Sequence, residues 1–214
     1  MKTQSIIKWG LCLVLVSVIG NSCVNDLDTV PLDEDISTAS NVFDDPANYV
    51  AVLAKLYAGL ALTGQQGPSG QADIEGIDEG FGQYLRMYWY AQELSTDEAI
   101  IGWNDQTIKD FHEQDWSADD GFVFALYSRI FYQVVICNEF LRETTQEKLD
   151  SRGVDASLAE TIRGYRAEAR FLRALSYYHA LDLFRNVPFV TEDDIIGAFF
   201  PDQIFAPELF NYIE

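Results

Sequence analysis

The sequence predicts an all-α protein with long irregular loops, and three observations support this prediction. Apolar residues recur at three- and four-residue spacing in long segments that start near residues 45, 120 and 155. An aspartate, a residue that favours helix N-termini, stands at the start of each segment. The two-residue alternation of half-buried strands is scarce. We therefore expect a scaffold of paired helices joined by polar and glycine-rich loops.

The first predicted helix begins at Asp45-Pro46, with aspartate as N-cap and proline at the first helical position. Its apolar face comprises Val50, Leu53, Tyr57 and Leu60. A glycine-rich loop follows over 64–82. It is not a phosphate-binding loop, because no strand precedes it and it has no lysine. We expect a short aromatic helix over 83–93 and irregular structure over 94–115.

The second long helix follows Ser117 and Asp120, which are spaced as an S-x-x-D capping box. Its apolar residues repeat at intervals of four and three: Val123, Tyr127, Ile130, Val134, Cys137 and Leu141. This register predicts that Cys137 is a buried core thiol.

The longest predicted helix covers about 155–185 and carries two apolar stripes separated by a polar seam. One stripe comprises Ala167, Phe171, Ala174, Tyr178 and Leu181; the other comprises Ala169, Leu172, Leu175 and Leu183; the seam comprises Arg166, Arg170 and Arg173. Two apolar stripes predict packing against neighbours on two sides, so we expect both Phe171 and Leu172 to be buried. Asn186, in the left-handed conformation, and Pro188 are expected to end the helix.

Residues 1–22 have the pattern of a secretory leader. Lys2 and Lys8 precede an apolar run over 9–19, small residues follow, and Cys23 stands where the mature chain would begin. This arrangement is typical of a bacterial lipoprotein signal, in which the thiol is acylated. An ordinary signal peptide and a membrane anchor are the alternatives, although the run is about half the length needed to span a bilayer.

The charge excludes one class of partner. The chain has a formal net charge of −20, and removal of the two leader lysines makes it −22. Such a surface repels phosphate backbones, so we expect no nucleic acid partner. Cys137 is the only cysteine after Cys23, which leaves no internal disulfide.

Four segments, in order, resemble the SusD/RagB family of outer-membrane nutrient-binding lipoproteins. They are Cys23 with the acidic stretch up to Pro31, ELSTDE at 93–98, Cys137-Asn138-Glu139, and RAEARFLRALSYY at 166–178 running into LFRNVP at 183–188. Family members usually have a glycine before the final Val-Pro, where this chain has Arg185-Asn186. Residues 206–214 have the pattern of a helix start, and the sequences of family members extend well past the position that corresponds to residue 214. The resemblance therefore indicates that residues 23–214 are an N-terminal, incomplete part of a SusD-like domain.

The resemblance implies a tetratricopeptide-type helical-pair scaffold and no catalysis. It implies a lipid-anchored protein exposed on the outer membrane that captures oligosaccharides for a SusC-like TonB-dependent transporter, and we expect no cofactor. No residue is assigned as a metal ligand. The acidic loops could hold calcium, although the sequence contains no EF-hand loop. RagB-like relatives handle peptides instead, so a peptide ligand stays open.

The candidate ligand site is the loop around Trp103. An indole offers a flat apolar face to a sugar ring, and Asn104, Asp105 and Gln106 offer amides and a carboxylate to its hydroxyls. Arg86 lies upstream among aromatic residues. In the family a loop tryptophan, a nearby amide or acid and an upstream arginine commonly contact sugar, and these positions match best.

Two other classes of function stay open but have weaker support. A helical-repeat scaffold for a protein partner would use apolar helix faces and not the Trp103 loop. A glycoside hydrolase needs two suitably placed carboxylates, which the abundance of acids does not establish. The two histidines, His112 and His179, have no i+4 partner for a zinc site, and His179 is expected in the core.

Overall fold

The computed structural model describes residues 38–64, 72–105, 107–197 and 200–214. The predicted leader, Cys23 and Gln106 lie outside the described residues. The chain divides into two compact units, Met1–Thr38 and Ala39–Glu214, and the account below concerns the second. Its elements are α2 (Ala39–Val42), α3 (Asn48–Ala58), α4 (Tyr84–Glu93), α5 (Asp110–Glu113), α6 (Gly121–Glu143), α7 (Gln146–Ser151), α8 (Ala156–Phe184), β1 (Val187–Pro188), β2 (Gln203–Ile204) and α9 (Ala206–Ile213). The predicted all-α class is confirmed.

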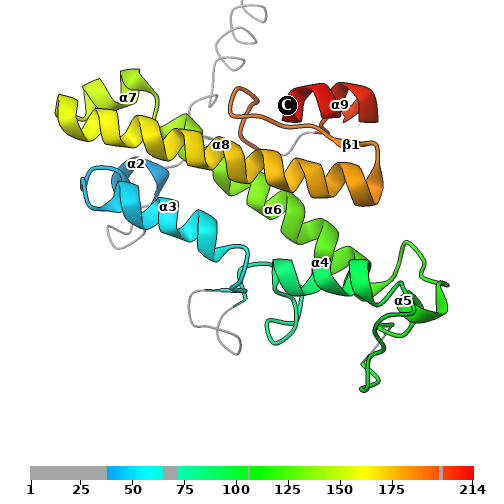
Figure 1. Ribbon diagram of the computed structural model, residues 1–214. Helices are drawn as coiled ribbons and strands as arrows, with labels where there is room; N and C mark the ends of the chain where they lie inside the picture. The colour runs from blue at the N-terminus through cyan, green and yellow to red at the C-terminus, as the bar shows by residue number, and fades with distance from the viewer. Residues whose placement is uncertain (1–37, 65–71, 106, 198–199) are drawn as a thin grey trace, which may run out of the picture. The chain divides into compact units, whose positions relative to one another are not determined.

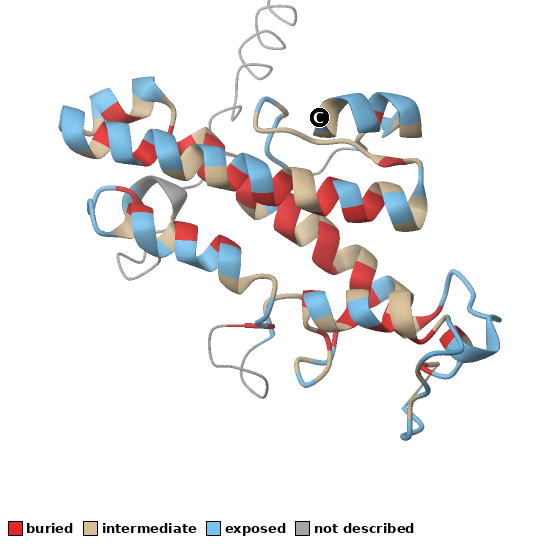
Figure 2. Cartoon of the chain, in the orientation of Figure 1, coloured by how far each residue is buried: buried red, intermediate tan, exposed pale blue. Residues whose placement is uncertain are grey.

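The core is built around α6 and α8, which pack against each other, with α3 in contact with both (Figure 1). Helix α4 packs on α6, and α9 packs on α8. Buried residues follow the facing sides of these helices (Figure 2). They include Ile130, Val134, Cys137 and Leu141 of the predicted α6 stripe. Burial raises the pKa of the Cys137 thiol to about 12, so it stays protonated in the core as predicted.

Helix α6 is also long and apolar enough to cross a membrane. Half of its apolar window is buried, however, and several of its polar side chains form hydrogen bonds within the protein. Gln133 donates to the Leu56 carbonyl (2.7 Å) and Asn138 donates to the Val190 carbonyl (3.1 Å). We therefore interpret α6 as a core helix.

Three helix ends differ from the sequence-based predictions. Asp120 alone caps α6, accepting from the amides of Phe122 and Val123, while Ser117 accepts from the Asp119 amide and takes no part in a capping box. Helix α3 starts at Asn48, because Asp45 caps a preceding turn through the Ala47 amide. At the end of α8 the residue with positive φ is Arg185 (φ 65°), not Asn186. The amide of Arg185 donates to the Leu181 carbonyl, so the backbone reverses one residue earlier than expected.

Two of the three arginines of the predicted polar seam of α8, Arg166 and Arg173, contact α6. Arg166 donates to the Leu141 carbonyl and to Thr144. Arg173 donates to the Asn138 side chain (2.6 Å) and forms an ion pair with Glu192. Arg170 is exposed. Because buried guanidinium groups need several acceptors, these contacts set how α6 and the segment after α8 lie along the long helix.

The chain after α8 folds back on it as a short antiparallel ribbon. Val187 pairs with Ile204, and Pro188 pairs with Gln203. The hydroxyl of Tyr177 donates to the Val190 carbonyl (2.7 Å) and accepts from the Val190 amide (2.9 Å). The Tyr177 ring also meets Tyr212 of α9 edge-on, which joins the ribbon and α9 to α8.

Only one of the two apolar stripes of α8 is covered. Leu172 is 2% exposed and belongs to the core formed with α3 and α6, whereas Phe171 is 63% exposed and Tyr178 is 50% exposed. The prediction that Phe171 is buried is therefore wrong for this structure. Periodicity shows that a face is suitable for packing, but it does not show that a neighbour is present.

The lowered pKa of the Glu143 carboxyl, at the end of α6, predicts that stability depends on pH. Burial acts to raise the pKa of its carboxyl, but hydrogen bonds from Lys148 and Arg152 outweigh this effect and lower it. A carboxyl with a depressed pKa stabilises the fold above its unfolded-state pKa, and this stabilisation is lost as the pH falls through the folded-state value.

We therefore expect the free energy of unfolding to fall as the pH drops below the ordinary glutamate range. Denaturant titrations across this range should show a smaller decrease for Glu143→Gln, which has no charge to lose. The exposed Glu160→Gln serves as the control and should keep the slope of the parent chain. An unchanged slope in Glu143→Gln would contradict the assignment.

Candidate functional site

The predicted ligand loop lies at the surface between α4 and α5. Trp103 is 50% exposed, and Asn104 and Asp105 are exposed beside it. The amide of Ile108 donates to the Asp105 carbonyl (3.0 Å), which turns the chain back toward α5. A half-exposed indole leaves part of its surface available to a ligand, and the exposed side chains of Asn104 and Asp105 can offer hydrogen bonds beside it.

Arg86 comes from α4 and is partly buried. Its Nε donates to the hydroxyl of Tyr90 (2.6 Å), and its Nη1 donates to the Gly80 carbonyl (2.9 Å). The guanidinium carbon also lies 5.5 Å from the centre of the Tyr90 ring. These contacts hold the guanidinium in place but leave some of its five N–H groups for a ligand.

The structure does not join the two parts of the predicted site directly. Within the described residues, no hydrogen bond or ring contact links Trp103 to Arg86. Each is positioned by its own segment, the loop for Trp103 and α4 for Arg86. A ligand that used both would have to bridge them.

Sequence reasoning did not assign a role to Trp89, which is exposed on α4 three residues after Arg86. Residues three apart share a helix face, and this spacing was the signal available in the sequence. Trp89 meets Tyr90 edge-on (ring centres 5.8 Å apart), so the partner of Arg86 also supports this indole. Trp116 is half-exposed too, but it borders an apolar pocket of about 200 Å³ and lies against Phe111.

His179 is a core residue, as predicted. Its Nδ1 lies 2.9 Å from the Tyr84 hydroxyl, and its ring stacks on Tyr88 at 4.1 Å. Burial lowers the pKa of His179, although the nearby Asp182 opposes the shift. The neutral imidazole therefore joins α8 to α4 and has no catalytic partner among these contacts.

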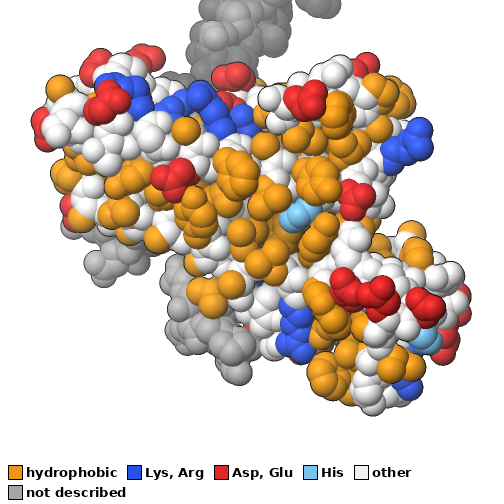
Figure 3. Space-filling model, in the orientation of Figure 1, with side chains coloured by type: hydrophobic (Ala, Val, Ile, Leu, Met, Phe, Trp, Pro, Cys, Tyr) orange, Lys and Arg blue, Asp and Glu red, His pale blue; other side chains and the backbone are white. Residues whose placement is uncertain are grey.

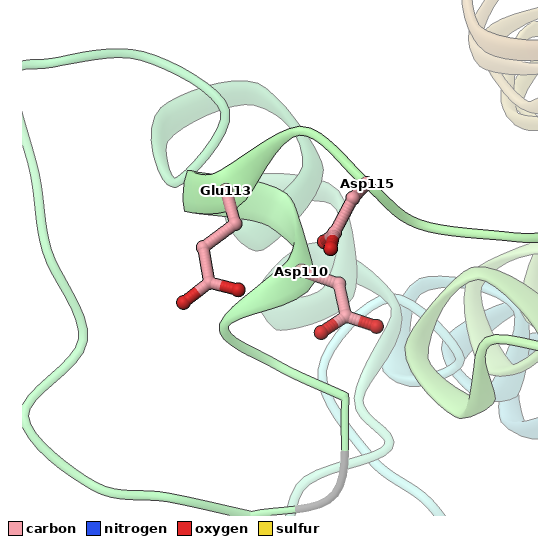
Figure 4. A group of neighbouring side chains, drawn as sticks. All are labelled: Asp110, Glu113 and Asp115. Atoms are coloured by element: carbon pink, nitrogen blue, oxygen red, sulfur yellow. The ribbon is translucent and has the colours of Figure 1, made fainter.

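The described residues contain one group of acids that could reach a common ion, on and after α5. Asp110, Glu113 and Asp115 each place a carboxylate oxygen within 4.8 Å of the others (Figure 4). Desolvation raises the pKa of Asp110, and the carboxylates of Asp115, Asp120 and Glu113 raise it further. Exposed acidic groups of this kind are common without an ion, so we assign no metal here.

The described unit is thus an all-α scaffold that presents an aromatic and polar loop to solvent. Over its whole length the chain is 35% identical to Starch-binding protein SusD of Bacteroides thetaiotaomicron, in an alignment of 218 positions. The resemblance to SusD that the four segments indicated is confirmed. The chain spans 36% of the length of this curated relative. No family model matches the chain.

Proposed function

We propose that the chain is part of a glycan-binding surface lipoprotein that captures oligosaccharides and delivers them to a SusC-like TonB-dependent transporter. The observation that carries this proposal is the 35% sequence identity to a starch-binding protein over the whole length of this chain. The half-exposed Trp103 supports it, because an exposed indole can pack against the apolar side of a sugar ring. The proposed role is binding without catalysis.

Affinity electrophoresis of the purified chain in gels containing starch tests this function. We expect retardation of the chain without release of reducing sugar. Release of sugar would instead indicate a glycoside hydrolase. Migration unchanged by starch but shifted by a mixed oligopeptide preparation would favour the RagB-like alternative, and insensitivity to both would favour a scaffold.

Trp103→Ala should weaken binding of starch oligosaccharides about 5- to 150-fold and leave the melting temperature nearly unchanged. Loss of a stacked aromatic ring removes about 1–3 kcal/mol by analogy with base stacking, and the side chain has little packing to lose. Arg86→Ala should weaken binding less, because contacts to hydroxyls compete with water. Titration calorimetry with parallel thermal melts measures both effects.

Trp116→Ala is the matched control for Trp103→Ala, because its indole is exposed to a similar extent but borders the apolar pocket beside Phe111, whose lining does not include Trp103. It should keep the affinity of the parent chain. Unaltered affinity in a stable Trp103→Ala variant would remove the loop from the site. A drop in both affinity and stability would reassign Trp103 to a packing role.

We further propose that Cys23 carries the lipid anchor, which would place the chain at the outer membrane. Each buried acyl methylene contributes about 0.8 kcal/mol to membrane attachment. Cys23→Ala should therefore leave the chain unprocessed or soluble when membrane fractions are separated. A Cys137→Ala variant controls for the loss of a thiol and should still partition with the outer membrane. Unchanged partitioning of Cys23→Ala would contradict the proposal.

A further inference from the structure

The guanidinium of Arg86 is held by two acceptors from different parts of the chain. Its Nε donates to the Tyr90 hydroxyl, and its Nη1 donates to the Gly80 carbonyl. Among the residues that the structure describes, Nη2 has no hydrogen-bond partner, and the side chain is only partly buried. Figure 3 shows basic side-chain atoms at the surface beside α4, next to hydrophobic side chains. The two contacts therefore leave Nη2 free to meet a ligand.

The Tyr90 hydroxyl has a fixed position, because the ring that carries it belongs to the core. Tyr90 is 4% exposed and meets Phe122 of α6 edge-on, with ring centres 6.0 Å apart. Phe122 is buried too, and its other face-to-edge neighbour is Phe111 of α5, the helix that follows the Trp103 loop. Close packing leaves a buried ring little room to shift. The hydroxyl is thus a fixed acceptor beside α4.

The second acceptor, the Gly80 carbonyl, belongs to a turn that is also held in place. The Gly80 amide donates to Asp78 Oδ1 (2.7 Å), and the Gly82 amide donates to the Asp78 carbonyl (2.8 Å). The buried Arg129 donates to the Gly82 carbonyl. A Cβ atom at position 82 would lie 2.6 Å from the Asp78 carbonyl oxygen, so a larger residue there would displace the turn. Both acceptors of Arg86 are therefore fixed before any ligand binds.

The contact with Tyr90 decides how the guanidinium is turned. Nε carries a single N–H in the plane of the guanidinium, so a bond from it to a fixed oxygen sets the orientation of that plane. Tyr90 can reach Nε because it lies one helical turn after Arg86 on the same face of α4. The orientation in turn sets the direction in which Nη2 points.

We propose that Tyr90 is a positioning residue of the ligand site: its hydroxyl orients Arg86 so that Nη2 is presented to a hydroxyl of the oligosaccharide. This inference rests on the proposed glycan binding. Tyr90 is buried and acts only through Arg86. A side chain that is already ordered does not have to lose its freedom when the ligand binds, which strengthens binding.

Titration calorimetry of Tyr90→Phe, which removes the hydroxyl and keeps the ring, tests the proposal. The variant should bind starch oligosaccharides about 2- to 12-fold more weakly, the effect of having to order one long side chain on binding. Tyr88→Phe is the matched control, because it removes a hydroxyl from the same helix but its ring stacks on His179. It should keep the affinity of the parent chain. Unchanged affinity in Tyr90→Phe would overturn the proposal.

A double variant shows whether Tyr90 acts through Arg86 or through the packing of α4. In the Arg86→Ala background, Tyr90→Phe should cause no further loss of affinity, because no guanidinium remains to be oriented. Circular dichroism should show all the variants folded. The same fold-loss in both backgrounds would mean that the hydroxyl acts elsewhere, and it would overturn the proposal.

A measurement without ligand separates this inference from the proposed function. In a chain with nitrogen-15-labelled arginine, the Arg86 Nε–H signal is identified by its absence from Arg86→Ala. Its exchange with solvent should be at least about tenfold faster in Tyr90→Phe than in the parent chain, because its acceptor is lost. The Nε–H of Arg129, which donates to the Gly82 carbonyl, is the internal control and should exchange equally in both chains.

Equal exchange rates for Arg86 in the two chains would overturn the positioning role, whether or not the parent chain binds starch. A rate that depends on Tyr90, in a chain that starch does not retard, would contradict the proposed function alone.

Discussion

Leu172→Ala is expected to lower the free energy of unfolding by about 2–5 kcal/mol, the range for truncation of a well-packed core leucine. Leu172 is 2% exposed and lies in the cluster that α8 forms with Leu53 and Leu56 of α3 and with Phe140 of α6. Removing its side chain leaves a cavity between three helices, which cannot all move inward to fill it.

Phe171→Ala is the matched comparison and should lower the same quantity by less than about 0.5 kcal/mol, because the side chain is exposed. Denaturant titrations at low protein concentration measure both variants without a contribution from self-association. Comparable losses at the two positions would mean that Phe171 is covered in solution. A loss below 0.5 kcal/mol at both would contradict the packing of α8 on α3 and α6.

The contrast between Leu172 and Phe171 shows which parts of the fold could be predicted. The spacing of apolar residues predicted α6 and α8 and the burial of Cys137, because a helix that buries one face must repeat apolar residues at its own period. The same spacing could not tell a covered stripe from a bare one. That difference depends on neighbours that the local pattern does not contain.

Helix ends were predicted less well, because several polar residues compete for the same backbone groups. Ser117 and Asp120 both fit an N-cap, and the structure uses the aspartate nearer to the apolar run. At the other end of α8, Asn186 suited the left-handed conformation best by residue type, yet Arg185 adopts the positive φ. There the pairing of Val187 with Ile204 sets where the chain must turn.

For the candidate site, residue type predicted which side chains are exposed better than it predicted which groups they contact. An indole among polar loop residues was expected at the surface, and Trp103 is exposed. The contacts of Arg86 with Tyr90 and Gly80 could not be foreseen, because the Gly80 carbonyl comes from an irregular segment with no sequence period. The exposure of Trp89 follows from how α4 packs on α6, which the sequence of α4 alone does not specify.

The buried ion pair between Arg129 and Asp73 should have a large effect on stability. The side chain of Arg129 is completely buried in α6; its Nη1 lies 2.6 Å from Asp73 Oδ1, and its Nε donates to the Gly82 carbonyl at 2.6 Å. The amide of Asp73 donates to the Thr63 carbonyl. These contacts hold Asp73 and Gly82 against α6, and Gly80, which accepts from Arg86, lies between them in the sequence.

Asp73→Ala should therefore lower the free energy of unfolding by about 3–5 kcal/mol, because it leaves a buried guanidinium without its counter-charge. Adding Arg129→Met should recover part of this loss, since an apolar side chain of similar length needs no counter-charge. Chemical denaturation of the parent, the single variant and the double variant measures the coupling. Exposed Asp150→Ala on α7 controls for the loss of a carboxylate and should change stability by less than about 0.5 kcal/mol. A double variant less stable than Asp73→Ala would show that the guanidinium still contributes through the Gly82 carbonyl, and that this backbone contact, more than the ion pair, holds the segment before α4.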